Sequence, residues 1–111
     1  MDAWISYIKE EENKEVLQVN GSFIAYQIID NECYVTDFFV PKSERGKGVG
    51  LFLAKELVEL AKEKKCSHMT CNIFIKPHNA DAFAHKVRLF TKFGFKPIGA
   101  LNNSVQMIKE I

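Results

Sequence analysis

The sequence predicts an α/β fold of the α+β kind, a mixed and mostly antiparallel sheet with two helices in the order β-β-β-β-α-β-α-β-β. Three observations lead to this prediction. Short runs rich in aromatic and β-branched residues fill the first third of the chain. The middle changes to a helical repeat of apolar residues, and turn-forming Asn and Gly separate the outer runs. The 111 residues suit one domain spanning 1–111.

Four strands are predicted ahead of the first helix. Their runs are residues 3–9 (AWISYIK), 15–19 (EVLQV), 22–29 (SFIAYQII) and 33–40 (CYVTDFFV). Asn20 and Gly21 join the second run to the third as a hairpin turn, because both residue types tolerate positive φ. Residues 30–32 (DNE) predict the next turn. The first third of the chain therefore reads as an antiparallel meander.

A helix is predicted from residue 50 to residue 65. Leu53, Leu57 and Ala61 recur at helical spacing, and charged residues occupy the other side. The run 68–75 (HMTCNIFI) is then a strand that lies parallel to the fourth strand, since a helical crossover connects the two in the usual right-handed sense.

The second helix is predicted to begin after Asn79, which can cap it, and to stop at Gly94. Its buried stripe is Phe83, Val87 and Phe90. A closing hairpin follows it. The two strands of this hairpin are residues 95–101 (FKPIGAL) and 104–111 (SVQMIKEI).

Charge and apolar pattern argue against several classes of partner. Lys and Arg number 15 and Asp and Glu 14, so a net charge of +1 gives no bulk attraction to nucleic acid or to an anionic membrane. No apolar run approaches the roughly 20 residues that span a bilayer, and the start of the chain does not resemble a signal peptide. Three cysteines without a C-x-x-C pair agree with a reducing compartment, so we expect a cytoplasmic protein.

The segment 45–50 (RGKGVG) lies between a predicted strand and a predicted helix. Glycines let backbone N–H groups converge, and the start of a helix adds free N–H groups and positive dipole, so this loop suits a phosphate or pyrophosphate. The P-loop pattern is not met, and the Rossmann fingerprint fails at Leu51, where it requires glycine. A flexible glycine turn with no ligand is the plain alternative.

Two motifs resemble those of the GNAT superfamily of N-acetyltransferases. Arg45, Gly48 and Gly50 satisfy R-x-x-G-x-G within "FFVPKSERGKGVG", which is similar to the pyrophosphate-binding motif of that superfamily. The segment 79–99 (NADAFAHKVRLFTKFGFKPIG) is similar to the later motif N...(Y/F)-x-x-x-G-F. With the order of elements, the resemblance to a GNAT-like fold covers residues 22–111. Use of the loop for ATP is a weaker alternative, because no acidic Mg²⁺ ligands accompany it.

The resemblance implies acetyl-CoA as cosubstrate. Its pyrophosphate would lie on the backbone of the glycine loop, and its pantetheine arm would pair with the main chain of the fourth strand, where that strand separates from the strand at 68–75. The residues assigned to acetyl-CoA in this way are Phe38, Phe39, Val40, Arg45, Gly46, Lys47, Gly48, Val49, Gly50, Asn79 and Phe90.

Acetyl transfer to an amine needs a base for the amine and an acid for the departing thiolate. The resemblance makes Asp37 the candidate catalytic base, with a solvent-exposed or lysine-paired carboxylate as the equal alternative. The acid in many members is a tyrosine at the position of Phe90. This departure leaves three alternatives: another group or water protonates the thiolate, catalysis is slow, or the fold binds CoA without turnover.

A metal site is not expected. Cys66 and His68 would point to one face of a strand and Cys71 to the other, so the three cannot converge on one ion without a bend. Cys71 is better explained as a buried structural thiol than as a nucleophile.

The acceptor side departs from the family pattern. Full-length members usually insert two helices between the first two strands, and only residues 10–14 separate the first two predicted runs here. This implies an open, shallow groove suited to a lysine on a protein surface, or one completed by a second subunit in a homodimer. Small phage-encoded members share this plan, which would place the protein in a host cytoplasm.

The sequence thus predicts an N-acetyltransferase that moves acetyl from acetyl-CoA to a primary amine, with a protein lysine favoured over a small molecule. The alternative is a weak or inactive CoA-binding or protein-interaction module with the same fold.

Overall fold

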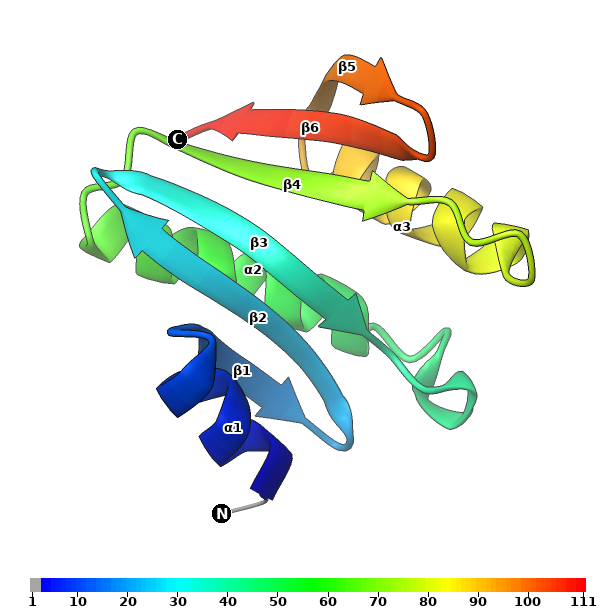
Figure 1. Cartoon of the computed structure of the whole chain (residues 1–111), viewed down its shortest axis with the longest axis horizontal. Coiled ribbons are helices and arrows are strands. Elements are labelled where there is room, and N and C mark those ends of the chain that lie inside the picture. The colour runs from blue at the N-terminus through cyan, green and yellow to red at the C-terminus, as the bar shows by residue number, and fades with distance from the viewer. Residues whose placement is uncertain (1–2) are drawn as a thin grey trace.

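The computed structural model describes residues 3–111, and its elements are shown in Figure 1. The helices are α1 (Ala3–Glu11), α2 (Val49–Glu63) and α3 (Ala80–Lys92), with a short 3-10 turn η1 (Lys42–Glu44). The strands are β1 (Glu15–Val19), β2 (Ser22–Ile29), β3 (Glu32–Phe39), β4 (His68–Phe74), β5 (Lys96–Leu101) and β6 (Ser104–Glu110).

The six strands form one sheet in the order β1-β2-β3-β4-β6-β5. β3 and β4 are parallel and every other neighbouring pair is antiparallel. Helix α2 connects the two parallel strands, as predicted. The mixed, mostly antiparallel sheet of the sequence-based prediction is therefore confirmed.

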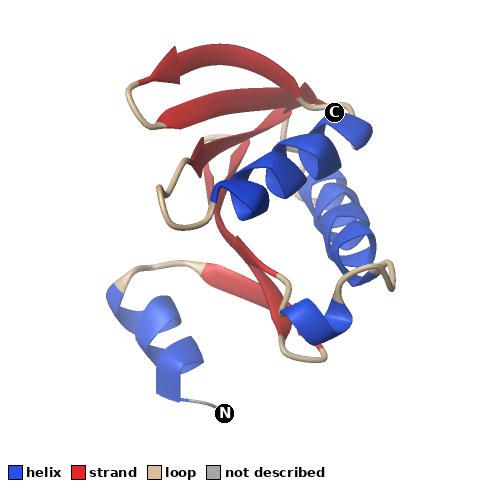
Figure 2. Ribbon diagram, turned by 90° about the vertical axis from the view of Figure 1, so that its right-hand side faces the viewer, coloured by secondary structure: helices blue, strands red, loops and turns tan. Residues whose placement is uncertain are grey.

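The prediction for the first element was wrong, because residues 3–9 lie in helix α1 and not in a strand. Ile5 is buried and Ile8, three residues later, is half-buried, which is helical spacing. The Trp4 ring lies 4.9 Å from that of Phe23 on β2. Figure 2 shows α1 on the face of the sheet opposite α2 and α3. The expectation of an open acceptor groove assumed that residues 3–9 form a strand and that no helix lies beside the groove. Because these residues form a helix, that assumption does not hold.

The predicted turns have the backbone they require. Asn20 and Gly21 have φ values of 49° and 79°, and Asp30 and Asn31 have 50° and 65°. Two successive residues with positive φ match the right-handed twist of a two-residue hairpin. Each pair therefore sets the register of its hairpin.

The core lies between the sheet and the two helices α2 and α3. Leu53, Leu57 and Ala61 of α2 are buried as predicted. Phe90 of α3 joins them, and Met107 of β6 closes the far side of the same cluster. In the part of the chain that is described, no helix is long and apolar enough to cross a membrane.

Candidate functional site

The two parallel strands separate halfway along their length. β3 and β4 pair from Glu32 with His68 to Val35 with Cys71, and within residues 3–111 the ladder between them stops there. β3 stays paired with β2 up to Phe39, while β4 stays paired with β6 to its end. The facing edges of residues 36–39 and 72–74 therefore carry backbone groups without a strand partner.

A β-bulge accompanies this separation. Tyr26 of β2 pairs with Val35 and the preceding residue of β2 pairs with Asp37, so Thr36 is an extra residue on β3. A bulge bends its strand and interrupts the alternation of faces. Val35 and Phe38 are buried accordingly, whereas Asp37 is exposed. The bulge thus turns Asp37 to the open face of the sheet while Phe38 enters the core.

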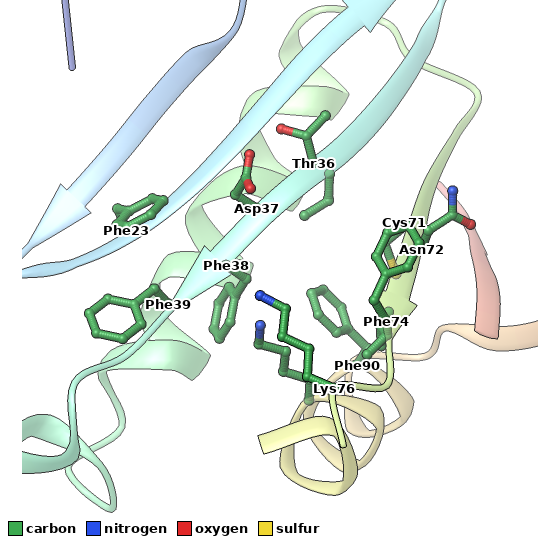
Figure 3. A pocket seen from close by; sticks show the side chains of 13 residues that line it. Phe23, Thr36, Asp37, Phe38, Phe39, Cys71, Asn72, Phe74, Lys76 and Phe90 are labelled. Atoms are coloured by element: carbon green, nitrogen blue, oxygen red, sulfur yellow. The ribbon is translucent and has the colours of Figure 1, made fainter. Parts of the chain in front are cut away.

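A cleft of about 470 Å³, which we call the transfer cleft, occupies the gap between the strands (Figure 3). Asp37 and Phe38 line it from β3, Cys71 and Phe74 from β4, and Phe90 from α3. The lining of the cleft is therefore both apolar and charged, with aromatic rings at its base and the Asp37 carboxylate at its rim.

A second, smaller cavity of about 190 Å³, the loop-side cavity, adjoins the transfer cleft. The two share part of their lining, including Phe38, Phe74 and Lys86. The loop-side cavity reaches Arg45 of the glycine loop and Asn79 before α3. We call the two adjoining cavities, whose linings extend from Arg45 to Asp37, the passage.

The glycine loop presents backbone donors. Gly46 and Gly48 have φ values of 78° and 81°, and a Cβ at either would meet nothing within 4 Å. Gly48 is the N-cap of α2. Residues 45–48 form turns, and among the described residues the first short amide-to-carbonyl bond after them runs from Phe52 N to Gly48 O, at 2.9 Å. The loop therefore has an open surface and N–H groups held only weakly by the turn, which suits an anion.

Gly50 is a glycine for a different reason. A Cβ there would lie 3.1 Å from Phe38 Cζ, 3.3 Å from Leu89 Cδ2 and 3.4 Å from Val40 Cγ2. These distances are tight for carbon contacts. Gly50 therefore lets α2 pack closely against the end of β3 and against α3.

The two basic residues of the loop are held to different extents. Arg45 Nε donates a hydrogen bond to Val40 O at 3.1 Å, which ties the loop to the end of β3. The Val40 main chain was also assigned to pantetheine from sequence. Its carbonyl therefore accepts one hydrogen bond, from Arg45, before any ligand binds. Lys47 Nζ, at the end of an exposed side chain, lies 3.9 Å from Oε2 of the half-buried Glu44. A pair this long with one exposed partner contributes little to stability.

Asp37 both lines the transfer cleft and has a lysine partner. Its Oδ2 accepts a hydrogen bond from Lys14 Nζ at 3.2 Å, and Lys14 Nζ also lies 2.9 Å from Glu12 Oε2. The pKa of Lys14 is raised, chiefly by its hydrogen bond to Glu12 and further by Asp37, although burial opposes this. Lys14 is therefore a stable cation beside the candidate base.

Phe90 and Asn79 occupy positions fixed by packing and capping. The Phe90 ring is 2% exposed and meets Phe38 and Phe95 edge-on, at centroid distances of 5.6 Å and 5.1 Å. The Asn79 side chain accepts a hydrogen bond from Ala82 N at 3.3 Å and so caps α3, as predicted. Both border the passage, Phe90 at the transfer cleft and Asn79 at the loop-side cavity.

Sequence reasoning missed four polar residues of the transfer cleft, which are Thr36, Asn72, Lys76 and Lys86. Lys76 and Lys86 both line it, and Thr36 Oγ1 is buried with no hydrogen-bond partner among the described residues. Burial lowers the pKa of the Lys86 ammonium, and the nearby Lys76 lowers it further. The spacing of Lys86, four residues before Phe90 on a predicted helix, was the available signal for its place in the cleft.

The thiols do not offer a nucleophile. Burial raises the pKa of Cys71 to about 12, although a backbone hydrogen bond with Met107 opposes the shift. Cys71 therefore stays a neutral thiol at the wall of the cleft. Within residues 3–111 no three His, Cys, Asp or Glu side chains gather in a way that could hold a metal ion.

Comparison with known proteins gives a family match and several relatives. The model of the acetyltransferase (GNAT) family matches residues 3–95. A probable spermine N(1)-acetyltransferase of Bacillus subtilis subsp. natto is 35% identical over 77 residues, which are 67% of this chain and 47% of that protein. The chain thus spans about half the length of this curated relative.

Two solved structures show the same fold. The PaiA N-acetyltransferase of Thermoplasma acidophilum, crystallised with coenzyme A, has a TM-score of 0.71 at 19% identity and covers 94% of this chain and 66% of its own. The ribosomal-protein-S18-alanine N-acetyltransferase of Escherichia coli has a TM-score of 0.68 at 15% identity, with coverages of 86% and 69%. At these identities the likeness concerns the fold.

Proposed function

The chain belongs to the acetyltransferase (GNAT) family, and on this premise we propose that it transfers an acetyl group from acetyl-CoA to a primary amine. The observation that carries the proposal is the separation of β3 from β4 beside the glycine loop. It leaves two strand edges without a strand partner and a cleft between them, and this cleft adjoins the cavity that reaches Arg45 of the glycine loop.

In this proposal the pyrophosphate lies on the amides of residues 46–51, where the start of α2 adds its dipole. The pantetheine arm carries amide groups, and these can pair with the free edge of β3 as an added strand would. Phe38, Phe39 and Val40 are proposed to supply that edge, and the Val40 carbonyl, which accepts one bond from Arg45 Nε, has a second lone pair for the arm. The thioester would then reach the transfer cleft.

The chemistry is attack of a neutral amine on the thioester carbonyl. The N–C bond forms, the C–S bond breaks, and the proton that the amine loses must end on the thiolate or in solvent. Asp37 is the proposed base, because it lines the cleft from the open face of the sheet, the face on which α1 also lies (Figure 2). Lys14 Nζ donates a hydrogen bond to Oδ2 of this carboxylate and so holds it at the rim of the cleft.

The acceptor is proposed as a primary amine of one of two kinds. The name of the curated relative supports a polyamine such as spermine. The protein lysine favoured from sequence alone rested on an open groove, and α1 has removed that basis. Spermine and spermidine are therefore the first acceptors to test, and a lysine peptide is the second. A homodimer and a cytoplasmic location are likewise proposals.

We expect purified protein with acetyl-CoA and a panel of amines to release free CoA thiol, and acetyl-CoA alone to raise the melting temperature. Ligand binding to the native state stabilises it by about 2.7 kcal/mol at a hundred times the dissociation constant. The assay compares spermidine, spermine and a lysine peptide, with a reaction lacking amine as control. Absence of both thermal stabilisation and thiol release would refute the proposed function.

Asp37→Asn should lower the rate roughly a hundredfold, since this is the low end of what a general base contributes. The loss should be largest below the pKa of the acceptor amine, where most of the amine is protonated, and should shrink as pH rises. Asp30→Asn in the exposed β2–β3 turn is the matched control, and we expect it to behave as wild type. A pH-rate profile of Asp37→Asn equal to that of wild type would remove Asp37 from the mechanism.

A second candidate function is a module that binds CoA without turning it over. Phe90 favours it, because this ring lines the transfer cleft and carries no hydroxyl to protonate a thiolate. The same assay separates the two: stabilisation by CoA with no thiol release from any amine favours the module.

A further inference from the structure

Lys86 is a half-buried lysine of α3 that lines both cavities of the passage. It lies four residues, about one helical turn, before Phe90, so the two share a face of the helix. Phe38 of β3 and Phe90 of α3 line the transfer cleft together with Lys86, and Figure 3 shows these two rings in the cleft. The side chain of Phe90 has no proton to give to a thiolate, but the ammonium of Lys86 lines the same cleft.

The other proton-bearing groups of the transfer cleft fit the task less well. The Cys71 thiol has a pKa of about 12 and is a poor acid at neutral pH. The hydroxyl of Thr36 is a weaker acid still. Lys76 lies on the exposed segment after β4, where its ammonium is hydrated and free to move. Lys86 alone among these described residues is a cation on a rigid element and partly out of water.

The charges around Lys86 come from three other elements. Asp37 faces it from β3, Arg45 from the glycine loop and Lys76 from the segment after β4, while exposed His85 is its neighbour on α3. Burial is the largest influence on its pKa and lowers it, Lys76 and Arg45 act in the same direction, and Asp37 opposes them. An unperturbed lysine ammonium, with a pKa of about 10.4, is a weaker acid than a thiol of about 8.5. The lowering brings the two closer and so favours proton transfer.

We propose that the Lys86 ammonium stabilises the departing CoA thiolate and gives it a proton. This rests on the proposed function. As the amine N–C bond forms and the C–S bond breaks, the sulfur takes the electron pair of the C–S bond and a proton from Lys86 Nζ. The acceptor nitrogen loses one proton to Asp37 or water, and neutral Lys86 regains one from solvent. The sum is acetyl-CoA plus amine giving amide plus CoA thiol.

The first test needs binding and no turnover. Free CoA is bound to the protein and its thiol is titrated through the ultraviolet absorbance of the thiolate. A cation close to the thiolate lowers the thiol pKa, so Lys86→Gln should raise the pKa of the bound thiol by about 1 relative to wild type. Lys86→Arg keeps the charge and should stay near wild type. Lys76→Gln is the matched control and should shift it much less.

The second test concerns proton donation. An acid must be protonated to act, so the wild-type rate should fall on the alkaline side as Lys86 loses its proton. Lys86→Arg retains the charge but does not release a proton, so its kcat should fall roughly a hundredfold without this alkaline limb. Its KM for acetyl-CoA should stay within about threefold, which a general loss of structure would not produce.

The outcomes separate the two proposals. If CoA binds and amines are acetylated, but the bound thiol titrates alike in wild type and Lys86→Gln, the role of Lys86 is refuted and the proposed function stands. If Lys76→Gln shifts the thiol more than Lys86→Gln does, the role of Lys86 is also refuted. If wild-type protein does not bind CoA at all, both proposals fail.

Discussion

Gly48→Glu is expected to abolish acetyl-CoA binding, lowering affinity by about a hundredfold or more, which corresponds to about 2.7 kcal/mol. The side chain would extend into the open space over the amides of the loop, because a Cβ at Gly48 meets nothing within 4 Å. Its carboxylate would compete for these N–H groups and repel a pyrophosphate. Isothermal titration with acetyl-CoA measures the effect.

The control for this substitution is Gly48→Ala. Gly48 has a φ of 81°, so any other residue there carries roughly 1–2 kcal/mol of backbone strain. Alanine has the strain without the charge, and its affinity should fall much less than that of the glutamate variant. A folded Gly48→Glu protein that binds acetyl-CoA with unchanged affinity would show that the loop is not the pyrophosphate site.

Phe90→Ala should lower the free energy of unfolding by about 3–5 kcal/mol, as is usual for loss of a buried phenylalanine. The ring is 2% exposed and contacts Phe38 and Phe95. Its removal would leave a cavity where β3, α3 and the start of β5 meet. Urea unfolding followed by circular dichroism gives the difference.

The control for Phe90 is Phe52→Ala on α2, where the ring is 50% exposed. Surface substitutions usually change stability by less than about 0.5 kcal/mol. If the two variants lost similar free energy, Phe90 would not be the core residue that its burial indicates. This difference is a measure of packing and does not depend on acetyl-CoA.

The sheet was predictable because its signals are local. Asn20 with Gly21 and Asp30 with Asn31 supply the positive φ values of two hairpins, and the apolar repeat of α2 has a clear period. Residues 3–9 carry no such marker, because AWISYIK satisfies alternation and helical spacing alike. Packing of Trp4 against Phe23 accompanies the helix, and this contact joins residues distant in sequence.

The backbone geometry of the candidate site was predictable from local sequence, whereas the side-chain pairs that join distant elements were not. The glycine pattern located the loop and its amides, since conformation alone demands glycine there. The Lys14 partner of Asp37 comes from 23 residues away, and Lys86 reaches the cleft only through the placement of α3 against β3. No sequence spacing specifies such pairs.

The arrangement of the cleft depends on the number of residues in β3, because Thr36 is an extra residue in that strand. In an unbroken strand, Val35 and Asp37 would face the same side, and the carboxylate would point into the core. Side chains alternate between the two faces of the sheet, and the added residue shifts this alternation by one position. Residues up to Val35 follow one alternation, and residues from Asp37 onward follow the opposite one. A point substitution does not change the number of residues in β3 and so leaves this alternation as it is. Loss or gain of one residue in β3 would move the carboxylate and the aromatic floor to opposite sides at once.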